Sequence, residues 1–226
     1  MTEHLSIVPI LLFSVVIHEM AHGWMALRLG DPTARDAGRL TLNPIPHIDI
    51  FGSILVPLLS LVSTGRIFIA WAKPVPVNPW NFSDFRRDDL MVSVVGPLSN
   101  LLLALACSIM VIALTLVGSF VARVDIRLFV ELWKFFMQMF LGGVYLNVGL
   151  AVFNLIPVPP LDGSHVLASL LPEEMAQSYR RIGFIGIFLI IFLMRVPVFN
   201  AAFGYILSAV FAPFGALIGL FLPLPS

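Results

Sequence analysis

One short segment near the start of the chain has the residue types and spacing of a metal centre. His18-Glu19-Met20-Ala21-His22 places two imidazoles four residues apart, with a glutamate between them. Residues four apart share one face of a helix, so both imidazoles can bind one metal ion while Glu19 lies beside them. A glutamate in this place can take a proton from a metal-activated water. The motif therefore predicts His18 and His22 as ligands and Glu19 as a base.

A third ligand must come from elsewhere, because catalytic zinc commonly takes three protein ligands and leaves its fourth position to water. The acidic candidates near the later apolar segments are Asp125, Glu131 and Asp162. Asp162 alone lies in a proline-rich, apolar break that could hold a carboxylate at membrane depth. We expect Asp162 to complete a site for one Zn²⁺ per chain; the alternative is a capping or turn role. His165 is a substitute ligand, a partner of the ligands, or a polar residue at the membrane interface.

The elements that must position this chemistry are those of a membrane protein. Of the 226 residues, 59% are hydrophobic and 12% are charged, against about 25% charged in soluble proteins. Apolar runs that approach or exceed the roughly 20 residues of a spanning helix occur at 5–27, 91–118, 135–156 and 198–222. A shorter run covers 182–194, and a marginal one covers 50–64. We expect an all-α integral membrane protein with about five to six transmembrane helices.

The first apolar run is expected to be a retained helix, because it holds the histidine motif and has no positive segment before it, unlike a signal peptide. Ionisable residues in such a helix are functional candidates by default, the alternative being a histidine pair satisfied by hydrogen bonds. Cys107 is the only cysteine, which excludes an intrachain disulfide and a cysteine-based zinc cluster. A net charge of zero gives no reason to expect a nucleic-acid partner.

We expect a single membrane-embedded domain over residues 1–226, with a catalytic core at about 5–170 and C-terminal helices at about 180–222. Within it, the prolines of Ala72–Pro79 forbid a helix and favour extended backbone. His22 lies about six residues before the end of the first apolar run, and Asp162 about six beyond the end of the run at 135–156. Both ends must then face the same side, so residues around 50–80 should form a re-entrant or extended interfacial segment.

Basic residues then indicate the orientation. The catalytic side would carry nine: Arg28, Arg35, Arg39, Arg66, Lys73, Arg86, Arg87, Arg180 and Arg181. The opposite side would carry four: Arg123, Arg127, Lys134 and Arg195. Because cytoplasmic loops are enriched in lysine and arginine, we expect a multi-pass protein of the cell membrane with its active site toward the cytoplasm.

Taken together, these residues resemble the site-2 protease family of intramembrane zinc metalloproteases. The matching segments are His18–His22, residues 38–44 and 47–49, residues 72–78, Gly96-Pro97 with Asn100, and residues 154–163. The resemblance is closest to the short bacterial and archaeal branch, whose members lack PDZ and cystathionine-synthase-type regulatory domains. It is specific, because the zinc motif and the Asn-x-x-Pro-x-x-Pro-Leu-Asp-Gly motif occur together in the expected order.

The resemblance implies that His18, His22 and Asp162 bind zinc and that Glu19 is the base, as the residues themselves indicate. It also implies that Asn154 hydrogen-bonds the substrate or its developing oxyanion. A buried amide donor suits that task. The alternative for Asn154 is to cap the unwound backbone that follows it.

The resemblance also implies a binding surface for the substrate, a transmembrane protein or peptide within the lipid bilayer. By analogy, Lys73, Val75, Val77 and Asn78 would offer an extended edge to a substrate that must be unwound before cleavage. His47 is given no catalytic role and is expected to be structural, at the interface. No organic cofactor and no oligomeric state are implied.

The function expected is hydrolysis of peptide bonds in membrane-embedded polypeptides, for regulated intramembrane proteolysis or clearance of membrane peptides. One rival is a metal or proton transporter that uses the same residues as a relay. It needs a polar path to the far side, where the helices have almost no ionisable residues. The other rival is a catalytically silent protein that holds a membrane client, against which the presence of Glu19 argues.

Overall fold

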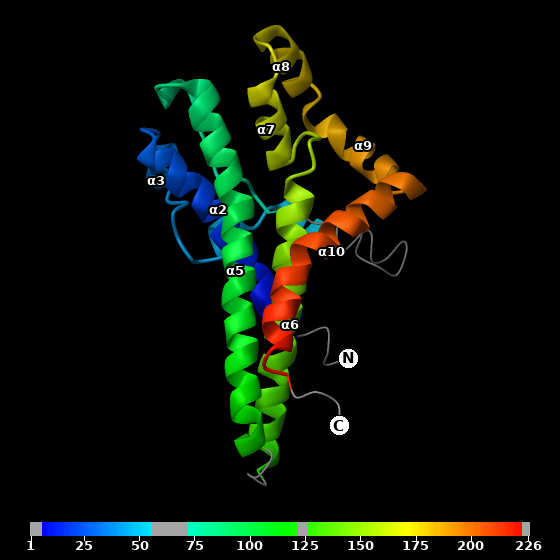
Figure 1. Ribbon diagram of the computed structural model, residues 1–226. Helices are drawn as coiled ribbons and strands as arrows, with labels where there is room; N and C mark the ends of the chain where they lie inside the picture. Colours follow the sequence, from blue (N-terminus) through cyan, green and yellow to red (C-terminus); the bar gives the residue numbers. More distant parts are fainter. Residues whose placement is uncertain (1–5, 56–71, 122–125, 223–226) are drawn as a thin grey trace. The chain divides into compact units, whose positions relative to one another are not determined.

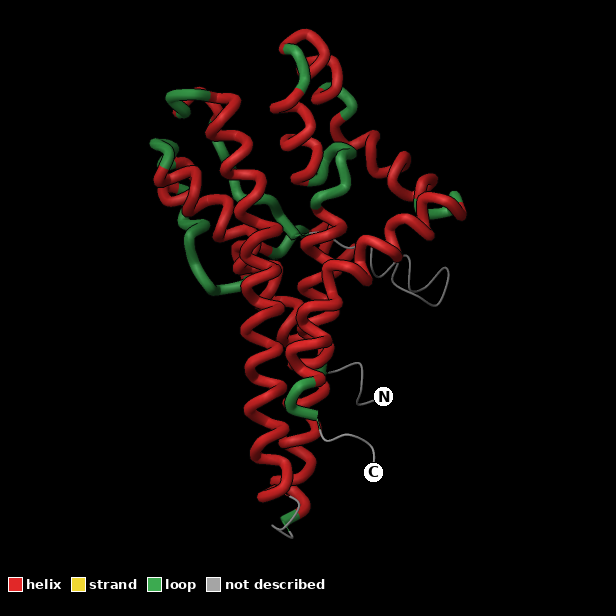
Figure 2. Tube along the Cα trace, viewed as in Figure 1, coloured by secondary structure: helices red, strands yellow, loops and turns green. Residues whose placement is uncertain are grey.

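A computed structural model describes residues 6–55, 72–121 and 126–222 (Figures 1 and 2). Helices joined by short loops make up these residues, and no strand occurs among them. The all-α prediction is therefore confirmed. Most of the marginal apolar run, and with it the expected re-entrant part of the segment around 50–80, lies outside the described residues.

The α-helices are, in chain order, α2 (Ile7–Arg28), α3 (Thr33–Asp36), α5 (Phe85–Val121), α6 (Arg127–Asn154), α7 (Asp162–Leu170), α8 (Glu173–Arg180), α9 (Gly186–Leu193) and α10 (Pro197–Gly219). Single 3₁₀ turns occur at Ile45–His47, Pro79–Asn81 and Gly183–Ile185, and one π-helical turn occurs at Ile50–Leu55. Between the π-helical turn and α5, residues 72–78 have no helical structure, as their prolines predict.

Four of these helices, α2, α5, α6 and α10, are long and apolar enough to cross a membrane. A fifth crossing results if Glu173–Arg180 and Gly183–Leu193, which meet at a bend of 68°, are counted as one broken span. The described residues thus hold four or five candidate spans, where the sequence predicts about five to six. The fifth predicted run, 182–194, forms the short helix α9, which is too short to span alone. The sixth, 50–64, lies mostly outside the described residues.

Contacts divide the chain into two units: residues 1–14 with 97–226, and residues 15–96. The boundaries fall inside α2 and α5, so each of these helices contributes to both units. In the larger unit, α6 runs beside the part of α5 that follows Pro97, and α10 packs on α6 (Figure 1). Its core consists of small and β-branched side chains, which let helices approach closely: Ile10, Ala104, Cys107, Val111, Val144, Val148, Val152 and Ile218.

A buried pair of amides joins α5 to α6 within this core. Asn100 Nδ2 donates to Asn147 Oδ1 at 2.9 Å, and Asn147 Nδ2 donates to the Gly143 carbonyl at 2.9 Å. Both asparagines are fully buried. Hydrogen bonds of this kind hold helices together in lipid, where an unsatisfied amide is costly. Their role is helix packing.

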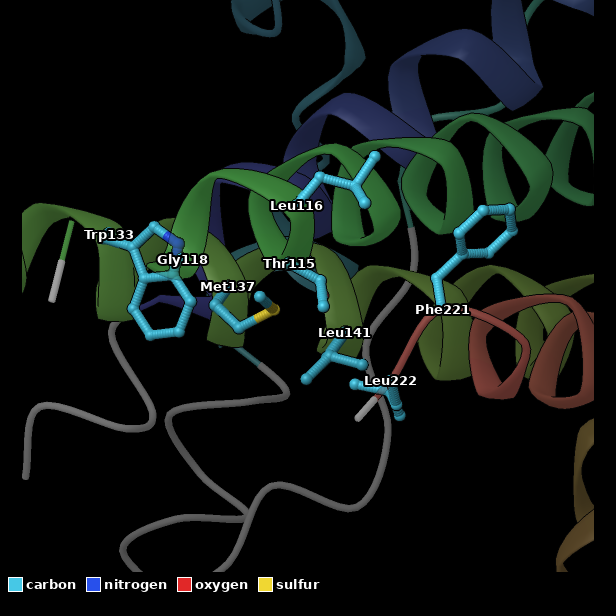
Figure 3. A pocket seen from close by; sticks show the side chains of 8 residues that line it. All are labelled: Thr115, Leu116, Gly118, Trp133, Met137, Leu141, Phe221 and Leu222. Atoms are coloured by element: carbon cyan, nitrogen blue, oxygen red, sulfur yellow. The ribbon is translucent and has the colours of Figure 1, made fainter. Parts of the chain in front are cut away.

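An apolar pocket opens between α5, α6 and the end of α10 (Figure 3). It is lined by Thr115, Leu116, Gly118, Trp133, Met137, Leu141, Phe221 and Leu222. The Thr115 hydroxyl donates to the Val111 carbonyl of its own helix, and the Trp133 indole N–H donates to the Leu114 carbonyl of α5. The pocket therefore presents apolar surface and no group suited to catalysis.

The smaller unit contains α2 from Val15 onward, the loops that follow it and the first three turns of α5. Near the end of α2, the Arg28 guanidinium lies 3.7 Å from the centre of the Trp24 ring. The two residues are four apart and therefore on one helix face. Tryptophan and arginine are common where a spanning helix reaches the membrane surface, which suits this end of α2.

Candidate metal centre

The two histidines of the motif converge on the same face of α2. Their Nε2 atoms lie 3.1 Å apart, and their rings meet edge to face with centroids 4.7 Å apart. His18 is buried and His22 is half-buried. Two nitrogen ligands of a tetrahedral zinc, each about 2.0–2.1 Å from the metal, lie roughly 3.3 Å from each other. The observed separation therefore fits two ligands of one zinc ion.

The tautomer of His22 is set by the backbone of α5. His22 Nδ1 lies 2.7 Å from the Val92 carbonyl oxygen. A carbonyl can only accept, so Nδ1 carries the hydrogen, and Nε2 of the neutral ring keeps its lone pair. Metal-binding histidines are usually held in this way by their second nitrogen. His22 is thus prepared to bind a cation through Nε2.

Gly96, one turn after Val92 on α5, leaves the space that the two imidazoles need. A Cβ atom at residue 96 would overlap His22 Nε2 and would lie 2.7 Å from His18 Cε1. Any side chain there would displace the ligand atoms. The sequence analysis named Gly96 only within the Gly96-Pro97 segment that matches the family, and it did not find this contact.

Glu19 is held by the extended segment that follows the undescribed residues. Its Oε2 atom accepts a hydrogen bond from the Val75 backbone N–H at 2.8 Å. Val75 is buried, and Glu19 is half-buried. The predicted base is therefore bonded through one carboxylate oxygen to a residue of the predicted substrate-binding segment.

The same extended segment is attached at both of its ends. At Lys73, the N–H donates to the His47 carbonyl at 2.9 Å, and the carbonyl accepts from Arg39 Nη2 at 2.6 Å. At Asn78, the N–H donates to Asp31 Oδ2 at 2.7 Å. The backbone N–H groups of Lys73, Val75 and Asn78 are thus all used within the chain. His47 is itself buried and bonds through Nε2 to the Thr41 carbonyl, which agrees with the structural role expected for it.

Asp31 anchors this arrangement from the loop after α2. The side chain is fully buried and also accepts hydrogen bonds from the Thr33 N–H and hydroxyl and from Asn81 Nδ2. Burial by itself would raise the pKa of this carboxyl, but the hydrogen bonds outweigh it and hold the pKa below the ordinary value of 3.8. The ionised Asp31 side chain therefore links the loop after α2 to the end of the extended segment through hydrogen bonds.

Asp162 and Asn154 belong to the larger unit, where they flank a proline-rich break. α6 ends at Asn154 and α7 begins at Asp162, so the predicted third ligand lies in the first turn of a helix. A carboxylate is favoured there by the helix dipole. His165 follows three residues later on α7, half-buried like Asp162. The Tyr179 hydroxyl of α8 donates to the Pro157 carbonyl at 2.7 Å and holds the break in place.

Asn154 makes a bond within its own helix. Its Nδ2 atom donates to the Leu150 carbonyl at 3.0 Å. An amide nitrogen has two hydrogens, so this bond uses one donor and leaves the second. The convergence of Asp162 with the histidines, and the contact of Asn154 with substrate, remain predictions.

Comparison with known proteins places the chain in a family. The model of peptidase family M50 matches residues 83–194, which include Asn154 and Asp162. YwhC of Bacillus subtilis, whose name classes it provisionally as a zinc metalloprotease, is 34% identical over 92% of this chain and 95% of its own. Rip2 of Mycolicibacterium smegmatis, named in the same way, is 29% identical over 85% of this chain and 67% of its own. Rip2 of Mycobacterium tuberculosis is 31% identical over 81% of this chain and 62% of its own. No solved structure matches the chain.

The chain therefore belongs to peptidase family M50, the site-2 protease family. It is a zinc metalloprotease and a multi-pass membrane protein. The resemblance inferred from the motifs is confirmed, and so are the predicted cofactor and the predicted class of enzyme.

Proposed function

We propose that this protease cuts polypeptides that are themselves embedded in the membrane, in regulated intramembrane proteolysis or clearance of membrane peptides. The observation that carries the proposal is the position of the site on α2, a helix long and apolar enough to span a membrane. His18, Glu19 and His22 lie within that helix. A substrate bond must then reach the depth of the membrane to be cut.

The residues proposed for the chemistry are His18, His22 and Asp162 as ligands and Glu19 as the base. Zn²⁺, when bound, supplies Lewis-acid polarisation of a carbonyl and lowers the pKa of water. Glu19 accepts the proton of the attacking water and passes it to the leaving amine. The bond from Val75 engages Oε2 of Glu19, and we expect Oε1 to carry the proton.

We further propose that Asn154 contacts the substrate with its second amide hydrogen. An amide donor aimed at a developing oxyanion stabilises the transition state. Lys73, Val75, Val77 and Asn78 are proposed to line the path of the substrate. Since three of them use their N–H groups within the chain, their contribution to substrate binding comes from side chains and carbonyl oxygens.

The site is proposed to open toward the cytoplasm and to belong to a single membrane-embedded domain over residues 1–226. The excess of basic residues on the loops of the catalytic side supports this orientation. Water reaches the site from that side.

The test compares the wild type with Glu19→Gln, both reconstituted in liposomes with a single-span substrate. The substitution keeps the shape of the side chain and both histidines, so zinc and substrate should still bind. Cleavage should fall by about 10²-fold or more, the scale for loss of a positioned general base. A soluble peptide with the same scissile sequence, added outside the bilayer, is the matched control for membrane embedding.

Comparable cleavage by wild type and Glu19→Gln would remove Glu19 from the mechanism. Faster cleavage of the soluble peptide than of the embedded substrate would overturn the proposed substrate class. If Glu19→Gln loses an ion flux that the wild type has, and no membrane substrate accumulates uncleaved, the transporter alternative would be favoured.

A further inference from the structure

The predicted base Glu19 and Gly23 lie one turn apart on α2, and the extended segment docks on the face that they share. Residues four apart lie one above the other on a helix. Val75 contributes to both contacts: its N–H donates to Glu19 Oε2 at 2.8 Å, and its side chain occupies the space beside Gly23. A Cβ atom at residue 23 would lie 2.8 Å from Val75 Cγ1 and from Leu40 Cδ2. Only glycine lets the segment come this close.

Prolines on both sides of Val75 make this contact well defined. Pro74 and Pro76 have no N–H, so Val75 supplies the only amide hydrogen between them. A residue that precedes proline is confined to extended backbone, which restricts the direction of the Val75 N–H. The bonds at Lys73 and Asn78 hold the two ends of the segment. A rigid donor is thus aimed at one oxygen of the carboxylate.

We propose that the Val75 backbone N–H is a positioning group for catalysis, which orients the Glu19 carboxylate for proton transfer. This inference rests on the proposed role of Glu19 as the base. A glutamate side chain in a helix can adopt several rotamers. A displacement of the base by about 1 Å can lower the rate roughly 10²-fold. The bond to Val75 restricts the side chain to one orientation. Gly23 leaves the space in which the Val75 side chain packs against α2.

Amide hydrogen exchange tests the contact without depending on activity. In the purified full-length protein, exchange is followed by NMR at the Val75 amide, whose neighbours Pro74 and Pro76 have no amide hydrogen. Glu19→Ala removes the acceptor and should accelerate exchange at Val75 by about 10-fold or more, the scale for loss of a hydrogen bond to a charged group. The Lys73 amide, which bonds to His47, serves as the internal control and should not change.

Kinetics test the positioning role. Val75→Pro removes the N–H and keeps extended backbone, whereas Val75→Ala keeps the N–H and removes only side-chain packing. We expect kcat of Val75→Pro to be about 10- to 100-fold below that of Val75→Ala, with equal zinc content and similar KM. Gly23→Ala should also lower kcat, because it pushes Val75 away from α2. Gly149→Ala is its matched control, since a Cβ atom there meets nothing within 4 Å.

Distinct results separate this inference from the proposed function. Unchanged exchange at Val75 in Glu19→Ala, or equal kcat for Val75→Pro and Val75→Ala in an enzyme that needs Glu19, would overturn the positioning role alone. A higher KM for Val75→Pro than for Val75→Ala, with equal kcat, would give the Val75 N–H a role in substrate binding alone and would also overturn the positioning role. Cleavage by the wild type that does not need Glu19 would overturn the role of the base, and the inference with it.

Discussion

His22 donates its Nδ1 hydrogen to the Val92 carbonyl at 2.7 Å, and its Nε2 atom faces Nε2 of His18 at 3.1 Å. The first contact explains the second, because a ring held at one nitrogen presents the other in a fixed direction. Two nitrogen lone pairs at this distance repel each other unless a cation or a proton lies between them. A metal ion shared by the two rings fits this separation, and we expect one there.

This relationship predicts the metal content. The purified wild type should hold about one zinc per chain, because three protein ligands suffice for a catalytic zinc. His18→Ala, His22→Ala and Asp162→Ala should each lose most of it, as measured by elemental analysis after gel filtration. His165→Ala is the control for the third ligand. Retention of zinc in Asp162→Ala, together with loss of zinc in His165→Ala, would make His165 the third ligand in place of Asp162.

Gly96→Ala should weaken zinc binding without unfolding the protein. The added Cβ atom would overlap the Nε2 atom of His22, so both imidazoles must move from the metal. We expect a loss of about 10- to 100-fold in zinc affinity, as for other disturbances around a ligand. Competition with a zinc-selective chelator measures it, with Gly149→Ala as the control. Equal affinities would mean that α5 shifts to accommodate the methyl group.

Asn154→Ala should slow cleavage with little change in zinc content. The amide uses one hydrogen in a bond to Leu150, and the proposed role requires the other. Loss of an oxyanion donor costs about 10² to 10³ in kcat. Kinetics with the embedded substrate decide this. An unaltered kcat would contradict the proposed contact with substrate and would leave Asn154 with a structural role at the end of α6.

Cysteine labelling can test the orientation of the site. With Cys107 replaced by alanine, a cysteine at Arg35, whose side chain is 59% exposed, should resist an impermeant reagent added to intact cells and react after lysis. A cysteine at Arg127, at the start of α6, should react in intact cells. The reverse pattern would place the active site outside the cytoplasm.

Asp31→Asn should destabilise the protein in a pH-dependent way. The native pKa of Asp31 lies below its unfolded value near 3.8, so the carboxylate contributes stability above that pH and loses it as pH falls through the native pKa. At pH 7 we expect a loss of about 1–3 kcal/mol, because a buried charged acceptor is replaced by a weaker one. Chemical unfolding in detergent between pH 7 and pH 3 measures it. A difference from the wild type that grows at low pH would contradict the assignment.

The sequence by itself predicted that His18 and His22 share one face of α2, and it predicted the helical membrane architecture and the extended segment around Pro74 and Pro76. Each of these follows from local rules: i and i+4 side chains share a helix face, long apolar runs span lipid, and proline forbids helix. Asp162 was selected from the sequence by its surroundings alone. Its convergence with the histidines is still to be tested by the zinc measurements.

Only the tertiary structure revealed what holds the histidines and Glu19 in place. The Val92 carbonyl orients His22, the Val75 N–H holds Glu19, and Gly96 leaves room for both rings. Two of these are backbone groups: a carbonyl, which every residue has, and an N–H, which every residue except proline has, so no residue type marks them in a sequence. The third is the absence of a side chain. Which backbone group meets which side chain depends on how α2, α5 and the extended segment pack, and packing between segments distant in sequence is decided only in three dimensions.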